Sequence, residues 1–403
     1  MLKLALRNLL RQRTRTALTL AAIVFGVAGL VLSGGFVRDI FVQLGEAVIH
    51  SQSGHLQVAR EGFFTHGSRK PEDYLIEDAG AIASKAQALP GVERVMARVL
   101  FSGLINNGRA DLAIAVQGVE PGKEAALGSH LMLASGRRLT DQDQYGILLG
   151  QGVAQALQLA VGDRVVLVAN MHGGGLNTLD LEVVGTFQTF SRDFDARTAQ
   201  ISLPAARELL DSRGVNTLVV ELASTPDTDR AAGQLRAALA GSGLEVRTWP
   251  DLNDFYAKTV TLYETQFGGL RLIILAMVLL SVVNSVNMGA FERLGEFGTM
   301  MALGNRHADV VRLIVTESAL LGVAGSVLGV VLGVILALLI SAMGIPMPPP
   351  PNANVGYVAS IRVVPWELAL AFGIGVAATV AASFVPARRL LKVPVVDALR
   401  QNV

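Results

Sequence analysis

The sequence contains no cysteine and only six histidines among its 403 residues. The absence of cysteine excludes disulfide bonds and cysteine-based metal sites. The histidines are scattered, and because His50 and His55 form the closest pair, we predict no metal site. The 34 Lys and Arg residues nearly balance the 33 Asp and Glu residues, which argues against nucleic acid as a partner.

Motifs that carry chemistry are also missing. The chain has no Gly-x-x-x-x-Gly-Lys-Ser/Thr loop for nucleotide phosphates, and no serine nucleophile with its supporting glycines. The long apolar segments lack the carboxylates of a proton relay, with Glu317 as the exception. We expect Glu317 to reach the membrane interface or to pair with Arg312. The sequence therefore predicts no catalytic, cofactor-binding or metal-binding residues.

What the chain does have is four long apolar segments without charged residues. They cover residues 16–37, 272–291, 318–345 and 368–387. About 20 apolar residues are needed to cross a bilayer, and only helices satisfy the backbone within such a segment. About 230 residues of mixed composition separate the first segment from the second. We predict an α-helical membrane protein with four transmembrane helices and a large α+β extracytoplasmic domain inserted between helices 1 and 2.

Basic residues beside the spans predict the orientation. They cluster at both ends of the chain: Lys3, Arg7, Arg11, Arg13, Arg15, Arg388, Arg389, Lys392 and Arg400. Both termini are therefore expected in the cytoplasm, and the large domain outside. A cleaved signal peptide over residues 1–35 is the alternative, although the apolar run is about twice the length of a signal core.

The sequence pattern of the large domain predicts short strands and helices. Asp78 is expected to cap a helix, and the Asn106-Asn107-Gly108 turn predicts a hairpin between residues 100–105 and 112–118. The closing strand-helix-strand pattern at 218–248 is expected to pair with the opening strand at 55–59. A helix from Pro250 is predicted to run into the second span, interrupted at Gly268-Gly269.

The loop between the second and third spans has an amphipathic pattern. A short helix here would carry Phe297, Met300 and Met301 on one side and Glu292, Arg293 and Glu296 on the other. Exposed Met and Phe beside charge are typical of a surface that docks into a groove on a soluble partner.

Two further patterns concern the membrane. Arg7, Arg11 and Arg15 recur every fourth residue and form a basic stripe suited to anionic lipid at the inner interface. Gly325, Gly329 and Gly333 form a small-residue face on the third span. This face is expected to pack closely against another span, in the same chain or in a second copy.

Four sequence runs carry a resemblance to a known family. They are LRNLLRQ at 6–12, LGQGVA at 149–154 followed by VGD at 161–163, ERLGEFGTMMALG at 292–304 and PARRLLKVPVVDALR at 386–400. Together with the arrangement of one span, a large domain and three spans, they resemble the FtsX-like permease family of ABC transporters, the MacB, LolC and LolE group. The chain lacks the ATPase domain that is fused in MacB.

The resemblance implies a permease subunit in the bacterial inner membrane. A separate ATPase would bind ATP and Mg²⁺, and a second permease copy, identical or related, would complete the transporter. Its coupling residues would be Glu292, Glu296, Phe297, Met300 and Met301. The implied segments are a cytoplasmic helix 1–15, spans 16–38, 271–291, 313–345 and 366–387, a MacB-like periplasmic domain 39–270 of two subdomains on helical stalks, a coupling loop 292–312, an outer loop 346–365 and a cytoplasmic tail 388–403.

The resemblance also implies a function. ATP hydrolysis would move the periplasmic domain and so extract or export a lipoprotein, a lipid or another amphipathic cargo. The alternative is an FtsX-type signalling scaffold that activates a periplasmic partner, such as a cell-wall hydrolase, without moving cargo. An enzyme with an outer active site is the third and weakest hypothesis, because no catalytic constellation supports it.

Overall fold

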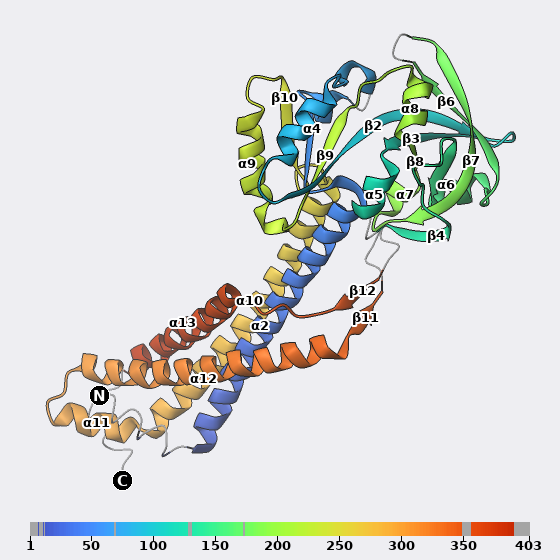
Figure 1. Cartoon of the computed structure of the whole chain (residues 1–403). Coiled ribbons are helices and arrows are strands. Elements are labelled where there is room, and N and C mark those ends of the chain that lie inside the picture. The colour runs from blue at the N-terminus through green and yellow to red at the C-terminus, as the bar shows by residue number, and fades with distance from the viewer. Residues whose placement is uncertain are drawn as a thin grey trace. The chain divides into compact units, whose positions relative to one another are not determined.

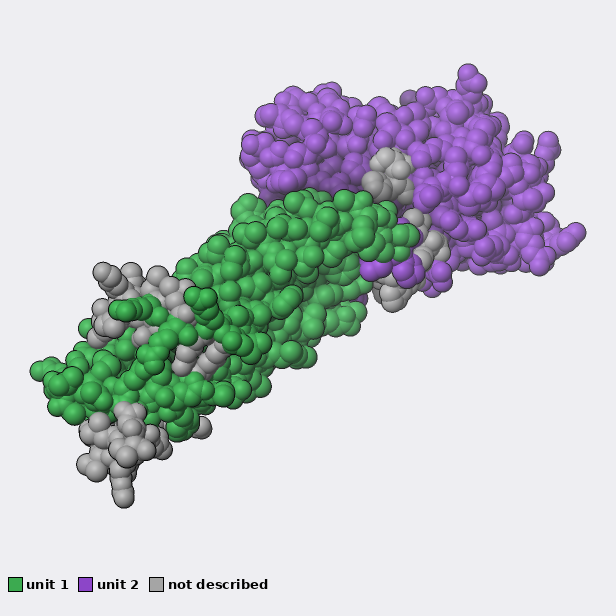
Figure 2. Space-filling model, turned by 90° about the horizontal axis from the view of Figure 1, so that it is seen from below, with its two compact units in different colours: residues 1–41, 259–346, 358–403 green, residues 42–258, 347–357 purple. Residues whose placement is uncertain are grey.

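The computed structural model describes residues 7, 11, 13–67, 70–127, 131–171, 174–348 and 356–390. The tail beyond residue 390, most of the Pro348–Pro351 run and the side chain of Arg15 lie outside this description. The chain divides into two compact units (Figure 2). Unit 1 comprises residues 1–41, 259–346 and 358–403, and unit 2 comprises residues 42–258 and 347–357.

Unit 1 is helical (Figure 1). Its long helices are α2 (Arg13–Val48), α10 (Asp254–Glu292), α12 (His307–Met343) and α13 (Pro365–Leu390), with the short α11 (Leu294–Ala302) between α10 and α12. Two of them, α2 and α10, also contribute residues to unit 2. Each long helix contains a stretch long and apolar enough to cross a membrane, and this confirms the predicted four-helix class.

Side-chain contacts give the relative directions of these helices. Contacts between α2 and α10 show that the two run antiparallel: Thr19 with Ser285, Gly26 with Val278 and Phe36 with Phe267. The α2–α12 contacts run in parallel: Ile23 with Gly325, Val27 with Gly329 and Val31 with Gly333. The α12–α13 contacts are again antiparallel: Gly322 with Thr379 and Ser326 with Gly375. This alternation is what four successive crossings require.

One prediction about these helices is wrong. Gly268 and Gly269 do not interrupt α10, which is continuous from Asp254 to Glu292. Each glycine costs a helix about 1 kcal/mol relative to alanine, and the flanking residues outweigh this. Two rings in the turns just before the glycines hold this part of the helix against α2: Phe267 lies 6.1 Å from Phe36, and Tyr263 lies 6.4 Å from Phe41.

Unit 2 is built on one mixed sheet. Its strands are β1 (Leu56–Arg60), β2 (Val92–Asn106), β3 (Asp111–Val119), β4 (Met132–Gly136), β5 (Gly146–Gly150), β6 (Arg164–Asn170), β7 (Leu176–Gln188), β8 (Thr198–Ser202), β9 (Thr217–Leu222) and β10 (Leu244–Thr248). The order is β10-β1-β9-β2-β3-β8-β5-β7-β4, and β6 pairs with β2 and β7. The first strand lies between the last two, which confirms the predicted pairing of the closing and opening segments.

Short helices connect these strands. They are η1 (Ile49–Ser53), α3 (Phe63–His66), η2 (Pro71–Tyr74), α4 (Ala79–Gln87), α5 (Pro121–Leu127), α6 (Gln151–Leu157), α7 (Arg192–Asp195), α8 (Leu203–Leu210), η3 (Thr225–Asp227) and α9 (Thr228–Ala238). A small pair, β11 (Ile345–Met347) and β12 (Tyr357–Ala359), lies outside the sheet. Two local predictions are confirmed: Asp78 accepts a hydrogen bond from the Ala81 N–H at the start of α4, and β2 pairs with β3 from Asn106 and Asp111 onward.

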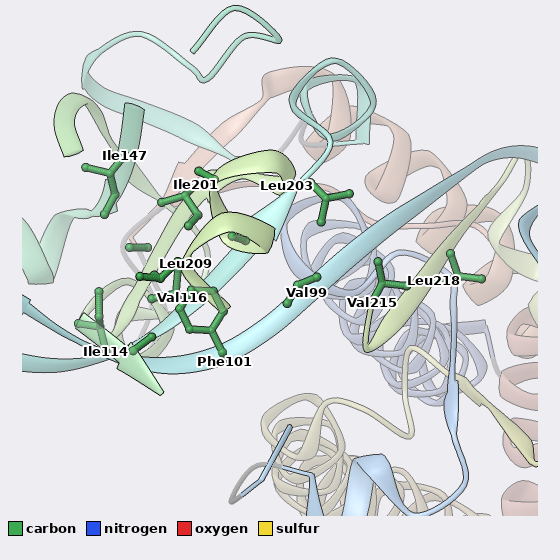
Figure 3. Close-up of a cluster of buried hydrophobic side chains, with 14 of the residues drawn as sticks. Val99, Phe101, Ile114, Val116, Ile147, Ile201, Leu203, Leu209, Val215 and Leu218 are labelled. Atoms are coloured by element: carbon green, nitrogen blue, oxygen red, sulfur yellow. The ribbon is translucent and has the colours of Figure 1, made fainter. Parts of the chain in front are cut away.

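Alternating apolar residues of the central strands form the core of unit 2 (Figure 3). Val99 and Phe101 on β2 pack with Ile114 and Val116 on β3, all of them buried. Leu209 of α8 belongs to the same cluster. Because successive strand residues point to opposite faces, this alternation fixes the register of β2 against β3.

Candidate functional site

Helix α11 forms a separate short element between α10 and α12. Gly304 ends it in a left-handed conformation, with φ of 93°. The next helix begins within three residues, where Asp309 accepts a hydrogen bond of 3.0 Å from the N–H of Arg306. A turn this short ties α11 closely to the first turn of α12.

The apolar side of α11 is covered by the protein itself. Phe297 is only 1% exposed and lies in a cluster with Ala290, Leu294, Val310, Leu313, Ile314 and Ala387. Met300 and Met301 are partly buried against the same cluster. The expectation that Phe297 is exposed for docking is therefore wrong, because three helices of unit 1 already bury its ring. Glu292 is exposed, and Glu296 is partly buried.

Arg293 joins the helices around this cluster. Its Nη1 lies 2.8 Å from Glu317 on α12, and its Nε lies 3.1 Å from Glu296 on α11. The guanidinium also lies over the Phe297 ring, 5.0 Å from the centroid. Glu296 in turn pairs with Arg11 at 2.9 Å. The structure thus gives Arg293 as a partner of Glu317, where the sequence had pointed to Arg312.

The electrostatics of this network favour its charged form. Burial alone would lower the pKa of Arg293, but the hydrogen bonds and charges of Glu317 and Glu296 raise it above the usual value. Burial would raise the pKa of Glu296, but the hydrogen bond and charge of Arg293 lower it below the usual value. Both shifts favour the charged forms of Arg293 and Glu296, and the guanidinium links α11 to α12 directly after the end of α10.

The exposed surface of this region lies at the end of α11. Leu303 is 81% exposed, and Thr299, Asn305, Arg306 and His307 are exposed beside it. The amphipathic pattern placed Arg293 on the polar side of the loop, but it did not identify Leu303 as a functional residue. The signal in the sequence was an isolated leucine directly before the glycine that ends the helix.

Two other predicted groups are found in unit 1. The face of Gly325, Gly329 and Gly333 lies against α2 of the same chain. A Cβ at position 329 would lie 2.7 Å from the Cβ of Val27, so the contact depends on the missing side chain. Arg7 and Arg11 are helical and exposed, and Arg11 reaches Glu296 as well as solvent.

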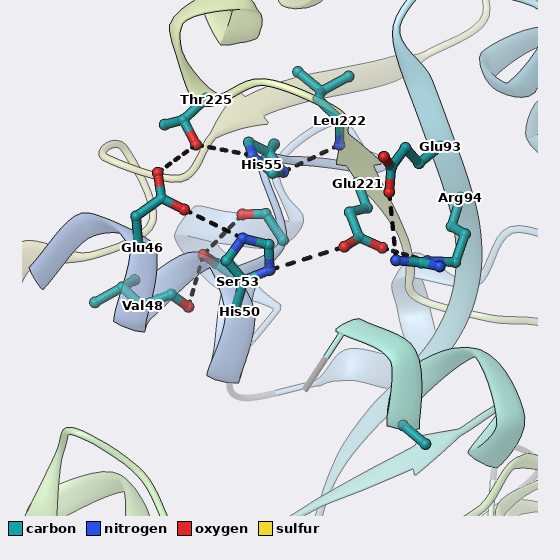
Figure 4. Close-up of polar contacts among 12 residues, drawn as sticks. Glu46, Val48, His50, Ser53, His55, Glu93, Arg94, Glu221, Leu222 and Thr225 are labelled. Atoms are coloured by element: carbon teal, nitrogen blue, oxygen red, sulfur yellow. Dashed lines mark hydrogen bonds and ion pairs between the residues drawn. The ribbon is translucent and has the colours of Figure 1, made fainter. Parts of the chain in front are cut away.

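A second polar cluster lies within unit 2, where α2, η1 and β9 meet (Figure 4). Nδ1 of His55 accepts a hydrogen bond of 3.1 Å from the Leu222 N–H, and its Nε2 lies 3.1 Å from Thr225 Oγ1. Thr225 donates to Glu46 at 2.7 Å. His55 is therefore neutral, and burial, followed by the charge of His50, lowers its pKa to about 4.

His50 lies between two carboxylates in this cluster. Its Nε2 is 3.2 Å from Glu46, and its Nδ1 is 3.8 Å from Glu221, which also pairs with Arg94 at 2.5 Å. Among the described residues, no group of three His, Asp or Glu side chains could hold a metal ion. The cluster links the end of α2 to strands β2 and β9 through hydrogen bonds and ion pairs.

Comparison with known proteins agrees with this architecture. The family model described as the MacB-like periplasmic core domain matches residues 16–238, and that of the FtsX-like permease C-terminal region matches residues 269–395.

Individual relatives have low sequence identity, but the similarity covers most of the chain. The chain is 24% identical to an uncharacterized ABC transporter permease of Methanocaldococcus jannaschii, covering 98% of this chain and 96% of that protein. It is 23% identical to the lipoprotein-releasing system transmembrane protein LolC of Neisseria meningitidis serogroup B, covering 77% and 74%. It is 26% identical to the macrolide export ATP-binding/permease protein MacB of Hyphomonas neptunium, covering 98% of this chain and 60% of that protein.

Proposed function

Because the chain belongs to the ABC transporter permeases with a MacB-like periplasmic core domain and an FtsX-like C-terminal region, we propose that it transmits ATP-driven motion. In this proposal a separate ATPase subunit hydrolyses ATP at the cytoplasmic face. The permease passes the resulting movement through its helices to the large domain. The chain itself contains no phosphate-binding loop, so ATP and Mg²⁺ would be bound by the partner.

The observation that carries the proposal is the Arg293 network around α11. A short helix that receives force must not slide on its neighbours, and Phe297 of α11 is buried in a cluster with residues of α10, α12 and α13. Arg293 adds two carboxylate contacts, one to α11 and one to α12. Charge-assisted hydrogen bonds of this kind are among the stronger ones in proteins. Movement of α11 would therefore carry α12 with it.

The surface that would meet the ATPase is the exposed end of α11. Leu303 offers an apolar side chain within a polar rim of Thr299, Asn305 and Arg306. An apolar centre with a polar rim is the usual anatomy of a protein interface. In this proposal, Phe297, Met300 and Met301 support the docking surface from inside, whereas Glu292, Glu296 and Leu303 stand at or near it.

The remaining parts of the proposal concern partners and cargo. The exposed apolar residues of α10, such as Leu272, Met277 and Leu280, would face lipid or a second permease copy. The relatives are named for lipoprotein release and for macrolide export. These names support an amphipathic cargo, taken from or through a bacterial inner membrane. The basic residues at both ends support cytoplasmic termini and a periplasmic large domain.

The docking surface is tested by comparing Leu303→Asp with Phe297→Ala in the full chain, co-expressed with the ATPase subunit that co-purifies with the wild type. We expect Leu303→Asp to abolish co-purification of the ATPase at unchanged thermal stability, because it places a charge at the centre of the contact. Phe297→Ala should lower the thermal stability of the permease, because a buried phenylalanine contributes about 3–5 kcal/mol.

Thr261→Val, an exposed change on α10, is the matched control, since it lies far from α11 in sequence. Full ATPase binding by Leu303→Asp would contradict docking at the end of α11.

Orientation is tested on the same cysteine-free background. A membrane-impermeant maleimide should label Ser84→Cys, but not Asn305→Cys, in intact spheroplasts. Capture of a cell-wall hydrolase by the large domain, with no cargo moved, would favour the signalling alternative.

A further inference from the structure

The segment that leads into α13 crosses α2 and contacts its backbone directly. The N–H of Arg362 donates a hydrogen bond of 3.2 Å to the carbonyl of Gly35. A Cβ at position 35 would lie 2.6 Å from the Arg362 carbonyl oxygen and 2.7 Å from the Ile361 side chain. Any side chain at position 35 would therefore lift this segment away. The contact requires glycine for close approach, although the local conformation is helical.

Two further side chains, one on α2 and one on α12, also bind this segment. Asp39, one turn along α2 and only 5% exposed at its side chain, pairs with the Nε of Arg362 at 3.4 Å. Ser341, near the end of α12, accepts a hydrogen bond of 2.9 Å from the N–H of Ile361. We name Gly35, Asp39, Ser341, Ile361 and Arg362 together the clasp. It joins α2, α12 and the segment that leads into α13 within unit 1.

The composition of the clasp does not follow from helix packing alone. Asp39 closely follows the apolar stretch of α2, where burying a carboxylate is costly, and such residues at membrane segments usually have a functional partner. Only the Asp39 side chain of this pair is buried, so removing Arg362 would leave a buried carboxylate without this counter-charge. Glu367 and Arg271, which lie beside Gly34, form a second pair, but their 3.9 Å separation is longer and the carboxylate of Glu367 is more exposed than that of Asp39. The Asp39–Arg362 pair is therefore the main charged contact of the crossing.

We propose that the clasp makes α12, the start of α13 and the adjoining part of α2 move as one body during the ATPase cycle. This inference rests on the proposed function and assigns Asp39 and Arg362 as positioning residues for transmission. Between residues 325 and 333, α12 touches α2 through glycines, which allow close approach but carry no polar side chain. The clasp adds hydrogen bonds and an ion pair close to residue 42, where α2 passes from unit 1 into unit 2.

The experiment uses the full permease with its ATPase in lipid nanodiscs. Hydrogen–deuterium exchange is measured with and without ATP and vanadate, on peptides from α11 and from residues 36–48. The variants are Asp39→Asn, Arg362→Gln and the charge swap Asp39→Arg with Arg362→Asp. Arg38→Gln, an exposed neighbour on the same helix, is the matched control.

We expect the wild type and Arg38→Gln to show a nucleotide-dependent change in both peptides. Asp39→Asn and Arg362→Gln should keep the change at α11 and lose more than half of it at residues 36–48. The charge swap should recover most of that loss, which a simple loss of folding would not allow. Because the chain has no cysteine, the double variant Asp39→Cys with Arg362→Cys can also be bridged by a reversible thiol cross-linker. The bridge should restore the response, and reduction should remove it.

An Asp39→Asn variant with the full wild-type response at residues 36–48 would contradict the proposed role of the clasp in transmission. A bridged variant that loses the response would do so as well, because it would mean that the crossing must open. If the wild type shows no nucleotide response at α11, the proposed ATPase coupling itself fails. These outcomes separate the two proposals, since only the last one concerns α11.

Discussion

The two units use opposite rules for apolar side chains. In unit 1, large residues such as Leu272 and Leu280 on α10 are 67% and 70% exposed. In unit 2, residues of the same kind, such as Leu149 and Leu167, are fully buried. This difference is expected if lipid surrounds the first unit and water the second, because lipid exerts no hydrophobic force on an exposed leucine. We therefore expect a different kind of contact to stabilise the inside of each unit.

Besides their apolar clusters, unit 1 contains close helix contacts at glycines, and unit 2 contains paired charged groups inside. Gly325, Gly329 and Gly333 bring α12 against α2. In unit 2, by contrast, Arg98 is only 2% exposed and forms a paired hydrogen bond with Glu124. Arg98 also donates to the carbonyl of Gln52 in η1. The comparison can be tested by removing one type of contact at a time.

The largest effect is expected in unit 2, from Glu124→Gln. This change leaves the buried guanidinium of Arg98 without a counter-charge, which typically costs about 3–5 kcal/mol. Urea unfolding followed by the fluorescence of Trp249, in a Trp366→Phe background, gives the free energy of unfolding of this unit. The double variant Arg98→Met with Glu124→Leu should lose much less, because no buried charge remains. Equal losses in the two variants would show that side-chain shape, and not charge, stabilises this site.

The next effect is expected in unit 1, from Gly329→Leu. The new side chain would overlap Val27 and the backbone of Val24, so we expect a loss of about 3 kcal/mol from overpacking. Thermal unfolding of the permease in detergent measures it. Gly268→Leu is the matched control, because a Cβ there meets nothing within 4 Å. A control as damaging as Gly329→Leu would refute packing through the glycine face.

A smaller effect is expected from pH, and only in unit 2. The pKa of folded His55 is about 4, below the usual 6.5. The unfolded chain therefore binds more protons between these values, and stability present above pH 6.5 is lost as the pH falls toward 4. From pH 6.5 to pH 5 the loss should be about 2 kcal/mol. Urea unfolding at both pH values should show this loss in the wild type and a flatter dependence in His55→Gln; parallel curves would exclude His55 as the cause.

Local patterns predicted the fold well. Charge-free length identified the four membrane helices, and a turn sequence identified the β2–β3 hairpin. Strands β4, β5 and β8 were not predicted, because each has only five residues and the last two are buried along their whole length, so neither alternates. A short buried strand cannot be told from other apolar runs by its period.

The candidate site was only partly predictable. The amphipathic pattern located α11, but such a pattern does not say whether the apolar face meets a partner, lipid or the chain itself. The structure shows that the chain itself covers Phe297. The Asp39–Arg362 pair spans 323 positions of the sequence, and no local pattern connects such distant residues. Long-range pairs of this kind become visible only when the helices are packed together.

The place of β1 between β9 and β10 has an evolutionary consequence. Leu56 pairs with Thr248 across neighbouring strands, so the chain enters and leaves the sheet of unit 2 at adjacent positions. Adjacent strands are about 4.8 Å apart, and a domain with such close ends can be inserted into a host chain without stretching it. Exchange of this segment between permeases would replace the large domain and keep the membrane helices.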